Sequence, residues 1–105
     1  MALVSATSRG AGINNLATGS FTSDNTATTI SLGFKPVWVK VINSTDTIVW
    51  EKLEGLAAAN SVKTVGAGTT TIDTGSAILI NADGTVTLSA TAVGNSKAIS
   101  WIAMA

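Results

Sequence analysis

The chain has 105 residues, with no His, no Cys, no Tyr and a single Pro. Six Lys and Arg balance six Asp and Glu, so the formal net charge is zero, and charged residues make up 11% of the chain against about 25% in an ordinary soluble domain. These counts exclude a disulfide framework, a thiolate or imidazole metal site and any catalysis that needs His or Cys, while the scattered basic residues argue against nucleic acid as the main ligand.

The low fraction of charged residues also bears on whether the surface of the protein is exposed to solvent or covered by a partner. A lone soluble domain stays dispersed through surface charge and a net charge away from zero. We therefore expect part of the surface to be covered by copies of the chain or by a partner; a weakly charged monomer rich in Thr and Ser is the alternative. We expect no membrane association, because no apolar run approaches the ~20 residues that span a bilayer and the first residues lack the basic region of a signal peptide.

Residues 1–15 are mostly small and polar, which predicts an irregular N-terminal arm ahead of one domain over residues 16–105. Three apolar side chains of this arm are candidates to anchor it against a partner: Leu3, Val4 and Ile13. A frayed terminus is the alternative interpretation.

The first clear strand pattern lies at residues 26–32, where Thr28, Ile30 and Leu32 share one face. The strongest pattern follows Pro36, at residues 37–43. Its alternating residues fill two faces, Val37, Val39 and Val41 on one and Trp38, Lys40 and Ile42 on the other. Because both faces are largely apolar, we expect this strand to be central or to lie at an interface.

The rest of the chain continues as short strands and turns. A strand at 47–52 carries Ile48 and Trp50 on one face, and the only helix candidate, 53–60, is weakened by Gly55, so we expect a loop or single turn there. Further strands are expected near 61–65, 69–73, 76–80, 85–90 and 97–103. Seven or eight short strands at this spacing predict an all-β fold, an antiparallel β-sandwich or jelly-roll-like barrel.

One short motif suggests catalysis. Asp73-Thr74-Gly75 after an apolar residue resembles the active-site loop of retropepsin-type aspartic proteases, in which two subunits each supply one Asp. Only 30 residues follow Gly75, and they predict a hairpin and a closing strand where such proteases have a flap, a second loop and a helix. The alternative, which we favour, is an ordinary turn.

No other motif carries chemistry. The acidic residues do not cluster in a calcium-loop spacing, and we assign no catalytic residue, metal site, cofactor or small-molecule substrate. The three Trp residues, Trp38, Trp50 and Trp101, all lie within expected strands, where they would anchor a core or a subunit interface. A platform that stacks on sugar rings is the alternative.

Several stretches resemble a known group. They are Gly-Phe-Lys-Pro-Val-Trp-Val-Lys-Val-Ile-Asn at 33–43 with Thr45-Asp46 and Trp50-Glu51 after it, Thr-Val-Gly-Ala-Gly-Thr at 64–69, and Ser-Lys-Ala-Ile-Ser-Trp-Ile-Ala at 96–103. Over roughly residues 20–105 the chain is similar to small β-rich virion proteins of tailed bacteriophages, of the head decoration or cement type. The arm is not covered by this resemblance.

The resemblance implies a non-enzymatic β-sandwich, often a trimer, that sits on the outer capsid surface of a virion. We expect the protein to be made in the cytoplasm of the bacterial host. Its expected partners are the major capsid protein and other copies of itself. The residues that we expect at these interfaces are Trp38, Lys40, Ile42 and Trp50, together with the arm residues named above. The alternatives are a tail-fibre or carbohydrate-binding module and the dimeric protease.

Overall fold

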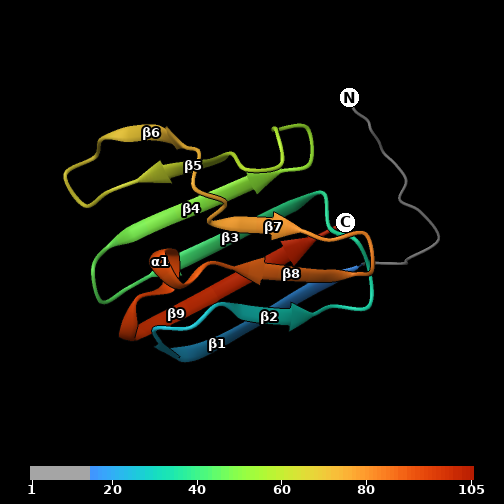
Figure 1. Cartoon of the computed structure of the whole chain (residues 1–105), viewed down its shortest axis with the longest axis horizontal. Helices are drawn as coiled ribbons and strands as arrows, with labels where there is room; N and C mark the ends of the chain where they lie inside the picture. Colours follow the sequence, from blue (N-terminus) through green and yellow to red (C-terminus); the bar gives the residue numbers. More distant parts are fainter. Residues whose placement is uncertain (1–14) are drawn as a thin grey trace.

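The computed structural model describes residues 15–105, which form nine strands and one short helix arranged as two stacked antiparallel sheets (Figure 1). The strands are β1 (Leu16–Asp24), β2 (Thr28–Ser31), β3 (Trp38–Asn43), β4 (Ile48–Leu53), β5 (Ser61–Thr64), β6 (Thr70–Asp73), β7 (Ile78–Ile80), β8 (Thr85–Leu88) and β9 (Asn95–Met104), and the helix is α1 (Ala90–Val93). The larger sheet has the order β1-β9-β3-β4-β5-β6, and the smaller has the order β2-β8-β7.

This arrangement confirms the predicted all-β antiparallel sandwich. No ladder joins the two sheets within residues 15–105, so the fold is an open sandwich and not a closed barrel. The smaller sheet covers only part of the larger one, and β5 and β6 project beyond it (Figure 1). The Val-rich strand, expected to be central or to lie at an interface, is central, because β3 pairs with β9 on one side and β4 on the other.

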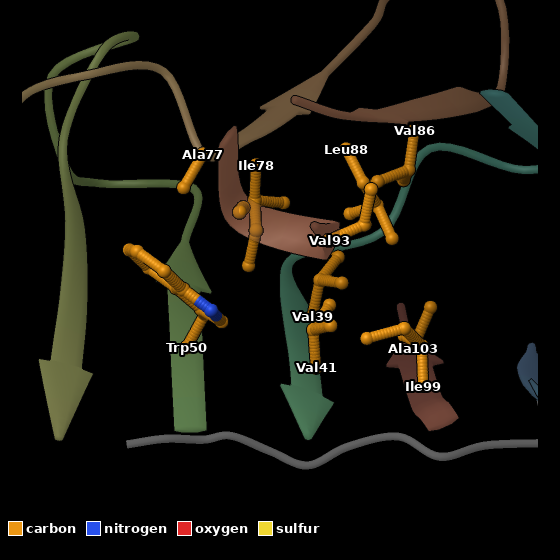
Figure 2. Packing of buried hydrophobic residues seen from close by; sticks show 11 residues of the cluster. Val39, Val41, Trp50, Ala77, Ile78, Val86, Leu88, Val93, Ile99 and Ala103 are labelled. Carbon is orange, nitrogen blue, oxygen red and sulfur yellow. The ribbon is translucent and has the colours of Figure 1, made fainter. Parts of the chain in front are cut away.

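The core lies between the sheets and follows from the period-two alternation of the strands. From the larger sheet, Val39 and Val41 of β3 point inward, and in Figure 2 they face Val93 of α1 and the side chains of the smaller sheet. The fully or almost fully buried apolar residues are Val39, Val41, Trp50, Ala77, Ile78, Val86, Leu88, Ala92, Val93, Ile99 and Ala103. The strands expected at 37–43 and 85–90 thus both supply core residues.

Strand β1 was not predicted, because its sequence is rich in Thr, Ser and Gly. It pairs along β9 with Gly19 opposite Trp101, and the Trp101 ring lies across the glycine. A Cβ at position 19 would lie 2.6 Å from Trp101 Cζ2, which no real structure accommodates without movement. The glycine therefore makes room for the indole, so a residue that is unfavourable in strands is required here.

Helix α1 is a second difference from the sequence prediction. The strand expected to reach residue 90 ends at Leu88, and Ser89 becomes the N-cap of α1, its Oγ accepting a hydrogen bond from Ala92 N at 3.1 Å. Gly94 ends the turn with a φ of 70°. This one turn buries Ala92 and Val93 against the core, a tertiary gain that outweighs the weak intrinsic stability of so short a helix.

Replacing Gly19 by Ala should lower the free energy of unfolding by about 1–3 kcal/mol, because the added methyl forces the Trp101 ring out of its place. Chemical denaturation followed by Trp fluorescence measures the change. Gly55→Ala is the matched control, since nothing lies within 4 Å of a Cβ there, and it should leave the stability unchanged or slightly raised. Equal effects of the two substitutions would contradict the proposed role of Gly19.

Candidate interaction surface

The six-stranded sheet has one face against the core and one face that no element of residues 15–105 covers. Most of the exposed large apolar side chains of the described chain lie on this second face: Leu16 at 52%, Ile42 at 36%, Leu53 at 50%, Ile72 at 54% and Met104 at 42% exposure. A contiguous exposed apolar surface is uncommon on a monomeric protein and marks an interaction site. We call this surface the outer face.

The register of the strand ladders sorts the outer face into three rows across the sheet. The first row is Leu16, Met104, Trp38 and Leu53. The second is Thr18, Ile102, Lys40, Glu51, Val62 and Ile72. The third is Ser20, Ser100, Ile42, Val49, Thr64 and Thr70. Apolar side chains make up the first row and the centre of the third, and hydroxyl groups lie at both ends of the third row.

Two opposite charges occupy the middle of the outer face. Lys40 of β3 and Glu51 of β4 are direct cross-strand neighbours, and they are the only charged residues in the three rows. Trp38 Nε1 donates a hydrogen bond to Glu51 Oε2 at 3.1 Å, which holds the indole of this half-buried Trp against the sheet. The outer face is thus apolar and electrically neutral overall, with one positive and one negative group at its centre.

The outward side of the smaller sheet shows what a solvent-facing surface of this protein looks like. Its strands present Thr29, Ser31, Thr85, Thr87 and Leu79. Asn81 Nδ2 donates to the hydroxyls of Thr85 and Thr87, each at 3.0 Å. The two outer surfaces of the same sandwich therefore differ in kind, and only the one on the larger sheet is apolar.

The structure brings together three of the four domain residues predicted for an interface. Trp38, Lys40 and Ile42 lie side by side along β3 on the outer face. Trp50 does not join them, and its assignment to an interface is corrected. It pairs with Val41, so its side chain points inward; it is 4% exposed, with Lys63 Nζ 4.8 Å from its ring centroid. The arm residues Leu3, Val4 and Ile13 lie outside the described residues.

Sequence reasoning missed most of the outer face. Leu16, Leu53, Ile72 and Met104 lie at strand ends or on edge strands, where no long alternation announces them. The sequence of β4 did contain one indication. If Ile48 and Trp50 point inward, Val49 and Leu53 must point outward, because side chains alternate along a strand, and they give β4 a second apolar face. The sequence does not show that the residues of β9, β3 and β4 that point away from the core align into continuous rows.

A hollow of about 350 Å³ at one end of the sandwich is a second place to look for a site; its lining includes Lys35, Lys52, Glu54, Leu56 and Leu79. Its most unusual group is Lys52, which is 3% exposed. The Nζ donates to the carbonyls of Ala57, Ala58 and Asn60 at 2.5 to 3.2 Å. Three acceptors use the three donors of an ammonium group, so this amine ties the 54–60 loop to the sheet and leaves no N–H for a ligand.

The Asp73-Thr74-Gly75 motif forms a local turn. Asp73 Oδ1 accepts a hydrogen bond from Gly75 N at 2.8 Å, and Ser76 N donates to Ala59 O at 3.0 Å. The carboxylate is therefore engaged in closing its own loop at the end of the edge strand β6, as the turn interpretation expects. Within residues 15–105 no three His, Cys, Asp or Glu residues come together as a metal site, and no helix is long and apolar enough to cross a membrane.

Comparisons with protein families, with curated proteins and with solved structures found no match to this chain.

Burial lowers the pKa of Lys52 below its ordinary value of 10.5. Just below pH 10.5 the folded protein therefore binds fewer protons at this amine than the unfolded chain does, so the free energy of unfolding should rise with pH in that window. Below the folded-state pKa both states are protonated and the contribution is constant.

Denaturation midpoints measured from neutral pH up to the ordinary lysine value test this expectation. The rise should disappear in Lys52→Met and persist in Lys35→Met, the matched removal of a half-exposed amine. A rise of the same size in Lys52→Met would assign it to other groups.

Proposed function

We propose that this protein is a structural virion component of a tailed bacteriophage that binds the outer surface of the capsid and stabilises it without covalent chemistry. The observation that carries the proposal is the outer face: a broad apolar surface on a rigid sheet, left uncovered by the rest of the domain. Such a surface is a ready-made interface with another protein. The resemblance of residues 20–105 to head decoration proteins supplies the assembly in which that interface would act.

The composition supports an assembly role in a second way. With charged residues at 11% and a net charge of zero, the chain has little of the repulsion that keeps free domains apart. The same property favours close packing of many copies on a shell, since neighbours of high like charge would repel one another. Binding to the assembled, folded shell then stabilises that shell by mass action.

Copy number in purified virions tests the proposal directly. Quantitative mass spectrometry of particles from the phage that encodes this chain should find it in amounts comparable to the major capsid protein. A handful of copies per particle would assign the protein to the tail or a fibre, and complete absence from particles would overturn a virion role.

Trp38→Ala should weaken binding to capsids by roughly thirtyfold, or about 2 kcal/mol, because large aromatic side chains are among the strongest single contributors to an interface. Binding to particles stripped of the protein can be measured by co-sedimentation. Thr29→Ala, on the polar outer surface of the smaller sheet, is the control and should bind like the unaltered protein. Unchanged binding of Trp38→Ala would remove the outer face from the interface.

A further inference from the structure

We propose that the outer face packs against the same face of a second copy, across a twofold axis that runs along the strands between β3 and β4. This inference rests on the proposed role of the outer face as an assembly surface and names a second copy as its partner, in place of the trimer that the resemblance implies. The dimer would then contact the capsid through its other surfaces, and Trp38→Ala would weaken capsid binding by separating the two copies. The order β1-β9-β3-β4-β5-β6 has its midpoint between β3 and β4. An axis there lays β3 over β4 of the second copy, β9 over β5 and β1 over β6.

The middle row is self-complementary under this rotation. Lys40 comes to face Glu51 of the second copy, and Glu51 faces Lys40 of the second copy, because the two residues are equidistant from the axis in the same row. One strand further out, Ile102 faces Val62 of the second copy. The interface therefore contains two contacts between Lys40 of one copy and Glu51 of the other, and the flanking apolar residues Ile102 and Val62 face each other.

The third row matches itself in the same way. Ile42 faces Val49 of the second copy at the centre. The outer pairs of this row are both hydroxyl pairs, Ser100 with Thr64 and Ser20 with Thr70. In the first row Trp38 faces Leu53. Apolar groups thus lie on apolar groups along β3 and β4, which is what an isologous interface requires. At the edges Thr18 faces Ile72 of the second copy, and Leu16 and Met104 face no residue of the three rows, because the first row ends at β4.

A twofold axis across the strands would not give matching contacts. An axis across the strands, along the middle row, would place Lys40 against Lys40 and Glu51 against Glu51. Like charges in contact are unfavourable. The two charges of the middle row therefore favour the axis along the strands.

The size of the outer face is adequate for such a dimer. Six strands about 4.8 Å apart and three side-chain rows about 6.8 Å apart span roughly 600 Å² on each copy. Two copies together reach roughly 1,200 Å², the lower end of the range for specific interfaces. Stacked sheets pack about 10 Å apart with their strands within about 30° of parallel, which a twofold axis along the strands allows.

Charge reversal on the full chain tests the inference through sedimentation equilibrium. The unaltered protein should sediment with twice the mass of one chain. Lys40→Glu sets carboxylates against Glu51 of the second copy at both contacts, and Glu51→Lys sets two ammonium groups against Lys40, so each variant alone should dissociate at least about tenfold more readily. Lys35→Glu carries the same change in charge away from the outer face and should dimerise normally.

Mixing separates the interface from effects within one chain. An equimolar mixture of Lys40→Glu and Glu51→Lys should recover a heterodimer, since every central contact again joins opposite charges, and the double variant should recover a homodimer. Mixing cannot restore the Lys40–Glu51 cross-strand pair or the Trp38–Glu51 hydrogen bond within one chain. If the loss of either of these caused the dissociation, the mixture would stay dissociated. Recovery supports the twofold interface even if the single variants are less stable.

Three results would overturn the inference: an unaltered protein that stays monomeric, an unaltered protein that forms trimers, or a mixture that associates no better than its components. A monomer whose capsid binding is still weakened by Trp38→Ala would retain the proposed function and reject the dimer. A dimer with the expected charge behaviour that is absent from virions would retain the dimer and reject the proposed function.

Discussion

The pairing of β3 between β9 and β4 is the constraint on which the rest of the structure depends. Its register commits Val39 and Val41 to the core and, with the same alternation, commits Trp38, Lys40 and Ile42 to the opposite side. A shift by one residue would exchange the two sets, because side chains in a strand alternate between faces. The register that buries the core therefore also builds the outer face.

A broad apolar face on a small domain is a liability as well as an interface. A wholly apolar sheet could stack on many surfaces in many registers, since the hydrophobic effect has no direction. Lys40 and Glu51 limit this freedom, because any partner that buries them must satisfy both charges. Two charged groups in an otherwise neutral surface thus trade some affinity for a defined orientation.

Three polar side chains away from the outer face hold local structure together. Lys52 holds the 54–60 loop through three carbonyls, Ser89 caps α1, and Asp73 closes the turn after β6. Each of these groups could in principle take part in catalysis or binding, but each is hydrogen-bonded to nearby backbone atoms. The outer face differs, because no other element of residues 15–105 covers its apolar side chains, and this directs the search for function to binding.

Sequence alone predicted the fold class and the division of the residues of β3 between two faces, because alternation with period two is a local property. It could not place Trp50, since a Trp in a strand looks the same in a core and in an interface until the neighbouring strand is known. It also missed β1, whose Gly19 is explained only by the Trp101 ring across it. Above all, the three rows join six strands that are distant in sequence. Only the tertiary structure aligns them, because the register between strands depends on hydrogen bonds and packing that no single strand encodes.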